Sequence, residues 1–163
     1  MFKVLIAEDE PPIMRMIKST LESVDSDFKV TECCINGKNA VEKLKNEDFD
    51  IVITDIKMPI MTGIELAGWI YQNKPDTKVI IVSGYSDFEY ARKALEYKVF
   101  DYLLKPISKD KVSELTQRIK SEIAEKNKMF AENNTIVILA CAGAYLLYGS
   151  EVLLPGERFW TDS

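Results

Sequence analysis

The sequence contains no histidine and only three cysteines, two of which are adjacent at Cys33 and Cys34. Without histidine the chain cannot form a Ser-His-Asp triad or another catalytic group that uses an imidazole, and it lacks the ligands of a zinc finger. The cysteines form neither a CxxC pair nor an even set, so they indicate neither a thiol metal site nor a disulfide framework. We interpret them as packing residues.

The sequence also lacks long hydrophobic segments, an excess of positive charge and a glycine-rich loop after its first apolar run. No run approaches the roughly 18 to 20 apolar residues that cross a bilayer, and the N-terminal run meets acidic residues too soon for a signal peptide. The net charge of −5 gives no footprint for nucleic acid or an anionic membrane. The missing glycine-rich loop argues against flavin or dinucleotide binding. We therefore expect a cytoplasmic protein whose own surface contacts neither a membrane nor nucleic acid.

Short apolar runs alternate with amphipathic stretches across the first 120 residues, and this alternation repeats five times. Such a pattern is typical of βα units, and nearly uninterrupted apolar runs are expected of parallel strands that are covered on both faces. The predicted strands are Phe2 to Ala7, Phe28 to Cys33, Ile51 to Thr54, Val79 to Ser83 and Phe100 to Leu104. The sequence therefore predicts an α/β protein with a doubly wound, five-stranded parallel sheet.

The C-terminal part of the sequence has a different composition. Ser108 can cap a fifth helix that we expect to continue as an extension or linker toward Asn133 and Asn134, and an apolar segment, TIVILACAGAYLLY, follows at 135–148. Three interpretations of this segment stay open: the first strand and turn of a further domain that is cut off, a strand or helix that packs on a second copy of the chain, or a lid on its own domain. A run this apolar does not stay exposed to water, so we expect self-association through it. The predicted parts are 1–122 for the main domain, 123–134 for the helical extension and 135–163 for the apolar tail.

Polar residues stand at the carboxyl ends of four predicted strands. Glu8 and Asp9 follow the first strand, Asp55 follows the third, Ser83 ends the fourth and Lys105 follows the fifth. Because the carboxyl ends of parallel strands share one edge of the sheet, these side chains should converge in a cleft, with Asp55 at its rim and not in the core.

The chemistry of these residues points to phosphoryl transfer. Three carboxylates in one cleft repel each other, so they require either a shared proton or a cation. Ligation by oxygen alone favours Mg2+. Lys105 and Ser83 can hold the oxygens of a transferring phosphoryl group, for which Asp55 offers a carboxylate nucleophile.

Four blocks of the sequence, in the right order and spacing, carry a resemblance to a known family. They are VLIAEDE, DIVITDIKMPIMTGIEL, VIIVSGYSDFEYARKAL and VFDYLLKPI, at the first, third, fourth and fifth predicted strands. Through them, residues 1 to 122 resemble the receiver domain of bacterial two-component response regulators. The resemblance implies a flavodoxin-like strand order 2-1-3-4-5 and phosphorylation by a sensor histidine kinase.

The resemblance also implies roles for individual residues. Asp55 corresponds to the phospho-acceptor, Lys105 to the phosphate-pairing lysine, Ser83 to the switch hydroxyl and Tyr102 to the switch aromatic residue. The bond before Pro106 corresponds to one that is cis in the family.

A magnesium site is implied in the same way. Its ligands would be Glu8, Asp9, Asp55 and the backbone carbonyl of Lys57. Phosphorylation would bias the surface made by the fourth helix, fifth strand and fifth helix toward a homodimer. The residues of the last two blocks further resemble those of receiver domains upstream of an AraC-type helix-turn-helix domain. We therefore expect DNA contact only through an output domain, of which this sequence shows no helix-turn-helix pattern.

In the signalling interpretation the domain is not an enzyme, and it catalyses only its own phosphorylation and slow autodephosphorylation. Two other functions compete with this interpretation. A phospho-aspartate phosphatase would need a second acid two residues after the nucleophile, where this sequence has Lys57. An interaction module that works without phosphorylation would keep the acidic pocket only as a vestige, which the complete residue set disfavours.

Overall fold

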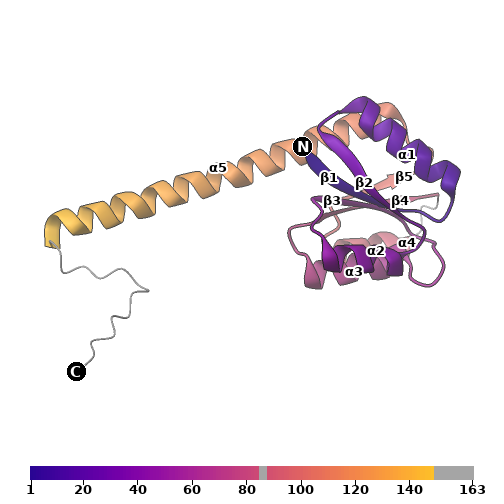
Figure 1. Ribbon diagram of the computed structural model, residues 1–163, viewed down its shortest axis with the longest axis horizontal. Helices are drawn as coiled ribbons and strands as arrows, with labels where there is room; N and C mark the ends of the chain where they lie inside the picture. Colours follow the sequence, from indigo (N-terminus) through magenta and orange to yellow (C-terminus); the bar gives the residue numbers. More distant parts are fainter. Residues whose placement is uncertain (85–87, 149–163) are drawn as a thin grey trace, which may run out of the picture. The chain divides into compact units, whose positions relative to one another are not determined.

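The computed structural model describes the backbone of residues 1–84 and 88–148 (Figure 1). Its sheet has five parallel strands in the order β2-β1-β3-β4-β5, which confirms the predicted fold class and strand order. The strands are β1 (Phe2–Ala7), β2 (Phe28–Cys34), β3 (Ile51–Asp55), β4 (Lys78–Ser83) and β5 (Asp101–Leu104). All five residues of β3 are buried, as is expected for a central strand that is covered on both faces.

Helices connect the strands and cover both faces of the sheet. They are α1 (Pro11–Val24), α2 (Gly37–Asn46), α3 (Gly63–Asn73), α4 (Phe88–Glu96) and α5 (Lys109–Tyr148). Figure 1 shows α1 on one face of the sheet and α2, α3 and α4 on the other. This arrangement places every strand-to-helix loop at the carboxyl edge of the sheet, where the polar residues that follow or end the strands lie.

Local signals in the sequence start two of these helices at defined residues. The Asn36 side chain accepts a hydrogen bond from the backbone N–H of Asn39 (2.8 Å) and caps α2. Thr62 and Glu65 form a capping box at the start of α3, in which each side chain accepts a hydrogen bond from the other residue's backbone N–H. Both caps lie in the loops at the carboxyl edge, so they fix the paths of the β2-α2 and β3-α3 loops.

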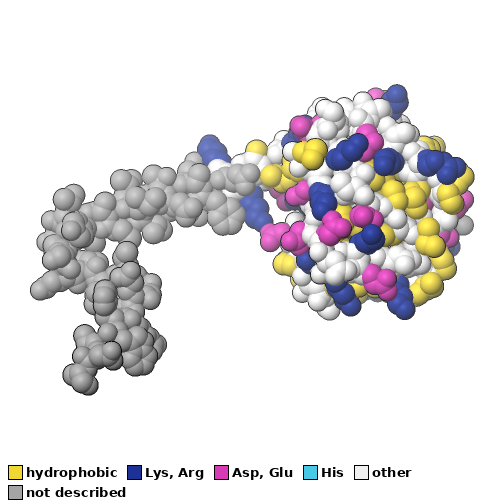
Figure 2. Space-filling model, viewed as in Figure 1, with side chains coloured by type: hydrophobic (Ala, Val, Ile, Leu, Met, Phe, Trp, Pro, Cys, Tyr) yellow, Lys and Arg dark blue, Asp and Glu magenta, His cyan; other side chains and the backbone are white. Residues whose placement is uncertain are grey.

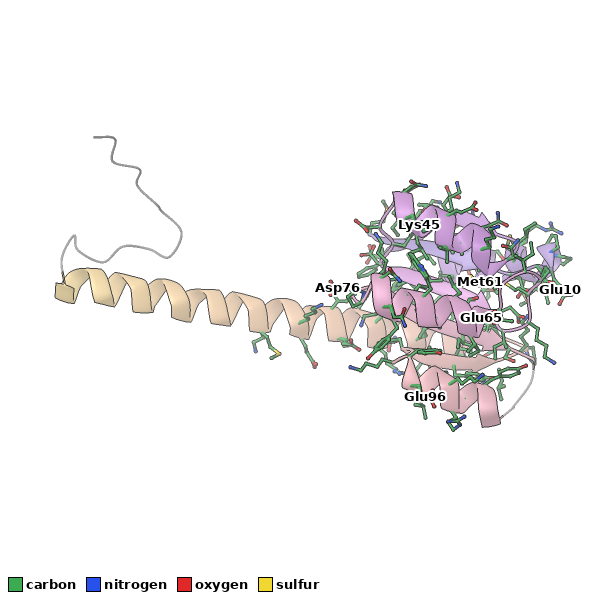
Figure 3. All side chains as sticks on the ribbon, turned by 90° about the horizontal axis from the view of Figure 1, so that it is seen from below. Glu10, Lys45, Met61, Glu65, Asp76 and Glu96 are labelled. Atoms are coloured by element: carbon green, nitrogen blue, oxygen red, sulfur yellow. The ribbon has the colours of Figure 1, made fainter. Side chains whose placement is uncertain are left out.

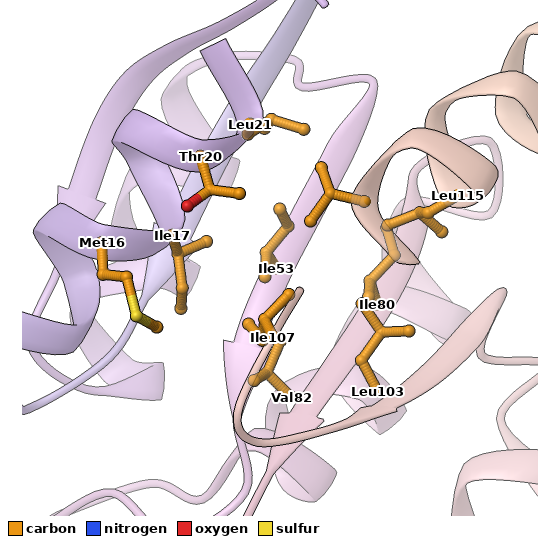
Figure 4. A pocket seen from close by; sticks show the side chains of 11 residues that line it. Met16, Ile17, Thr20, Leu21, Ile53, Ile80, Val82, Leu103, Ile107 and Leu115 are labelled. Carbon is orange, nitrogen blue, oxygen red and sulfur yellow. The ribbon is translucent and has the colours of Figure 1, made fainter. Parts of the chain in front are cut away.

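The core between α1 and the sheet is closely packed. It encloses a cavity of only about 10 Å3, which is barely the volume of one water molecule (Figure 4). The cavity lining is almost entirely apolar, with residues from α1, three strands, the β5-α5 loop and the start of α5: Met16, Ile17, Thr20, Leu21, Ile53, Ile80, Val82, Leu103, Ile107, Val112 and Leu115. This cavity offers no room for a ligand.

The chain divides into two compact units, Met1–Gln117 and Arg118–Ser163, and α5 contributes to both. The backbone of 135–148 is helical, so an interpretation that begins this segment with a strand is wrong. A helix that packs on a second copy, a lid, and self-association through this segment stay predictions. The remainder of the predicted tail, 149–163, lies outside the described residues, and the division into three parts stays a prediction. Among the helices that the structure describes, none combines the length and hydrophobicity needed to cross a membrane.

Candidate functional site

Three of the predicted site residues meet in direct contact at the carboxyl edge of the sheet. The Lys105 Nζ lies 2.7 Å from Asp55 Oδ1 and 2.9 Å from Glu8 Oε2. The three residues come from the ends of β5, β3 and β1, which are 97 positions apart at their extremes. The structure therefore brings these three side chains together, as predicted.

Asp55 is held at both carboxylate oxygens. Besides the Lys105 contact, its Oδ2 accepts a hydrogen bond from the backbone N–H of Lys57 (2.8 Å). Asp55 is the last residue of β3, whereas the prediction placed it just after the strand, and only 8% of its surface is exposed, so the expectation of an unburied rim position is wrong.

The ion pair of Glu8 and Lys105 is partly buried, with Lys105 as its more exposed member. Glu8 is completely inaccessible to solvent, and burial raises the pKa of its carboxyl group even though the Lys105 ammonium opposes the shift. Burial by itself would lower the pKa of Lys105, but its hydrogen bonds to Asp55 and Glu8 and their negative charges raise it. Because the pKa of Lys105 is raised, this side chain remains a cation between the two carboxylates.

The acidic residues form a group that fits a hard divalent cation. One carboxylate oxygen from each of Glu8, Asp9 and Asp55 lies within 4.8 Å of the others. Oxygen-only donors at this spacing suit Mg2+, which commonly uses a few carboxylates and keeps water on its other positions. The donor chemistry therefore fits the predicted metal, whereas the predicted role of the Lys57 carbonyl stays a prediction.

The two predicted switch residues lie on the neighbouring strands. Ser83 is buried at the end of β4, and its carbonyl accepts a hydrogen bond from the backbone N–H of Lys105 (2.7 Å). Tyr102 on β5 pairs in register with Ile81 of β4 and packs, partly buried, against the core. This geometry links the lysine to the strand that carries the hydroxyl, and the bond between Lys105 and Pro106 is cis, as the resemblance implied.

Gly63 is a site-forming residue that the sequence analysis missed. A Cβ atom at this position would lie 1.9 Å from the Asp55 carbonyl oxygen, so only glycine lets α3 begin directly behind the nucleophile. The Gly63 N–H donates to the carbonyl of Ile56 (3.0 Å) and closes the loop that follows Asp55. The signal available in the sequence was the Thr-Gly pair that precedes an apolar helix.

Comparison with known proteins places this geometry in a family. Residues 4–120 match the model of the response regulator receiver domain. The uncharacterized transcriptional regulatory protein YesN of Bacillus subtilis is 34% identical over 127 residues, which are 78% of this chain and 34% of that protein. The chain spans 30 to 49% of the length of three curated relatives that it matches.

Solved structures agree with the family match. The receiver domain of AraT, a response regulator from Geobacillus stearothermophilus, is 32% identical, with a TM-score of 0.68 over 77% of this chain and 98% of that one. The response regulator TrrA from Thermotoga maritima, solved in complex with Mg2+ and BeF, is 28% identical, with a TM-score of 0.65 over 73% of this chain and 99% of that one. With its strand order, acidic edge and bridging lysine, the chain belongs to the receiver domain family of two-component response regulators.

Proposed function

We propose that this receiver domain takes a phosphoryl group onto Asp55 from a phosphohistidine of a sensor histidine kinase. The contact of the Lys105 ammonium with both Asp55 and Glu8 is the observation that carries this proposal. In the reaction the P–N bond of phosphohistidine breaks, a P–O bond to a carboxylate oxygen of Asp55 forms, and the released imidazole takes up a proton.

The residues around Asp55 have distinct tasks in this reaction. Lys105 pairs with the incoming negative charge, and the Lys57 backbone N–H holds one carboxylate oxygen in place. Glu8, Asp9, Asp55 and the Lys57 carbonyl would hold Mg2+, which when bound neutralises charge on the phosphoryl oxygens. Such positioning and charge stabilisation account for most of the catalysis in phosphoryl transfer.

We propose that the same event switches a surface of the domain. The Ser83 hydroxyl would turn to the new phosphoryl oxygens and Tyr102 would follow, biasing the surface of α4, β5 and α5 toward a homodimer. This surface carries an ion pair between Arg92 and Glu96 on α4, whose charges could exchange partners across a two-fold axis. In a longer parent protein the dimer would control transcription, in line with the relatives that are transcriptional regulatory proteins. An AraC-type output domain stays a prediction.

Intact mass measurement tests this function. We expect the chain to gain one phosphoryl group when it is incubated with Mg2+ and phosphoramidate, a small phosphodonor. Asp55→Asn should abolish the gain, whereas Asp76→Asn, a matched change of an exposed carboxylate at the opposite edge of the sheet, should leave it intact.

The same experiment separates the competing functions. Sustained release of inorganic phosphate over many turnovers would indicate a phosphatase, although Lys57 occupies the position where such an enzyme has its acid-base carboxylate. No mass gain in wild-type protein would contradict phosphoryl acceptance and leave an interaction module.

A further inference from the structure

Two large aliphatic side chains are exposed on the loops at the carboxyl edge. Ile35 follows β2 and is 58% exposed, and Ile60 lies in the loop after Asp55 and is 78% exposed. In Figure 2, hydrophobic side chains gather on the side of the folded domain that lies away from the N-terminus in Figure 1. Exposed apolar groups that cluster beside a reactive residue commonly mark a contact surface.

The two loops that carry these isoleucines are in direct contact. The Gly37 N–H donates to the Met61 carbonyl (3.1 Å), and a Cβ at Gly37 would lie 2.8 Å from that oxygen and 2.9 Å from Met61 Cγ. Figure 3 shows Met61 toward the same end of the domain as Glu10, whereas Asp76 lies at the other end. The β2-α2 and β3-α3 loops therefore form one joined surface beside the acidic site.

Ile60 adopts an unfavourable backbone conformation to present its side chain there. Its φ is +70°, and the Met61 N–H donates to the Pro59 carbonyl (2.7 Å), which makes a γ-turn centred on Ile60. Positive φ is disfavoured for β-branched residues, and γ-turns of this hand are rare and strained. Glycine would relieve this strain, so an isoleucine at this position carries a conformational cost for the fold.

We propose that Ile35 and Ile60 form an apolar docking contact for the protein that donates the phosphoryl group to Asp55. This inference rests on the proposed function. Because Asp55 is 8% exposed, a donor histidine must be brought close to the carboxyl edge, and its own domain then lies over the adjoining loops. The surface is continuous with the reaction site, since Asp55 is the last residue of β3 and Ile60 lies in the loop that follows it. The donor surface that fits it carries aliphatic or aromatic side chains around its phosphohistidine.

A small phosphodonor does not need this contact. The ratio of the phosphorylation rate with a kinase to the rate with a small donor therefore tests the contact. Purified, autophosphorylated sensor histidine kinases are screened for transfer to the wild-type chain, and the fastest serves as protein donor, with phosphoramidate as small donor. The variants are Ile35→Ser, Ile60→Gly and their combination. Tyr71→Ser on α3 is the matched control, since Tyr71 is an exposed large side chain outside both the carboxyl-edge loops and the proposed dimer surface.

We expect the double variant to lose about tenfold in its rate with the kinase, as is typical of losing a central apolar contact, and to keep its rate with phosphoramidate. Tyr71→Ser should keep both rates. Ile60→Gly should unfold at a higher temperature than wild type and still react more slowly with the kinase, which a purely structural role of Ile60 does not predict.

Three results would overturn the docking contact. They are an unchanged kinase rate in the double variant, an equal loss with both donors, and transfer to the wild-type chain from none of the kinases. The first two leave the proposed function standing as long as phosphoramidate labels Asp55, whereas the third also counts against a histidine kinase as the donor. A failure of phosphoramidate to label the wild-type chain would refute the proposed function itself, so the two failures are distinguishable.

Discussion

Replacing Gly63 with alanine should distort the nucleophile more than any change of comparable size. The added Cβ would lie 1.9 Å from the carbonyl oxygen of Asp55 and 2.8 Å from Thr54 Oγ1. Unbonded carbon and oxygen atoms rest about 3.3 Å apart, so either the end of β3 or the start of α3 must move by more than about 1 Å. No flexible side chain can absorb that movement, because the closest atom belongs to the backbone of a buried strand that is paired on both sides.

The size of the loss follows from this geometry. Overpacking a core usually lowers the free energy of unfolding by about 1 to 3 kcal/mol, and a backbone clash belongs at the upper end. We expect Gly63→Ala to lose about 3 kcal/mol, which corresponds to a fall of about 12 °C in Tm for a domain of this size. Because Asp55 moves with its carbonyl, labelling by phosphoramidate should also slow.

The same substitution at Gly84 is the control. A Cβ at this exposed position would meet no atom within 4 Å among the described residues, so Gly84→Ala should change the Tm by no more than about 2 °C. Thermal and urea unfolding of the three proteins, followed by circular dichroism, measure the difference. If the free energy of unfolding of Gly63→Ala lies within about 1 kcal/mol of the wild-type value in these experiments, the close contact does not constrain the site and the reasoning fails.

Four further changes have defined outcomes. Ile60→Gly should raise the free energy of unfolding by about 1 kcal/mol in urea titrations, because it relieves a positive φ at a β-branched residue. Thr62→Ala should lower it by about 1 kcal/mol, because the capping box with Glu65 is lost. Burial raises the pKa of Glu8 above 4.5, so the folded state binds this proton more tightly than the unfolded state, and stability falls as the pH rises from about 4.5 through the folded pKa. Without Mg2+, Glu8→Gln should therefore have a higher free energy of unfolding than wild type at neutral pH, and the two values should converge below pH 4.5. If the excess stability of the variant instead grows as the pH falls, the argument is refuted. Lys105→Met should bind Mg2+ at least about tenfold more tightly in isothermal titration and accept a phosphoryl group more slowly, because it removes a cation 2.7 Å from Asp55.

The sequence predicted the strands well because buried parallel strands leave continuous apolar runs, and each predicted boundary falls within one residue of the structure. It predicted the meeting of Glu8, Asp55 and Lys105 for a topological reason, since all parallel strands end at one edge. Details of the loop paths left weaker signals. Nothing in the local sequence indicates that Ile60 has a positive φ, or that Lys98 ends α4 in a Schellman motif where glycine is usual.

The tail shows where local composition misleads. Its β-branched run, Ile136 to Ile138, favours a strand by propensity. In the structure the segment continues a helix that begins at Lys109, and extending an existing helix avoids the cost of nucleating a new element. The secondary structure of this segment therefore depends on what precedes it more than on its own residues.

The charge balance of the site connects its resting geometry with its proposed chemistry. Three ionised carboxylates and one ammonium leave a formal charge of −2, which a single divalent cation neutralises. Phosphorylation of Asp55 replaces one carboxylate charge with about two phosphoryl charges, so the modified site again carries excess negative charge. Lys105 is the cation already in contact with Asp55, and moving toward the phosphoryl group would weaken its pairing with Glu8. Since Glu8 is fully buried and cannot turn to solvent, this carboxylate needs the metal most once Asp55 is phosphorylated. The buried glutamate thus gives a physical reason for metal binding and phosphorylation to be mutually reinforcing at this site.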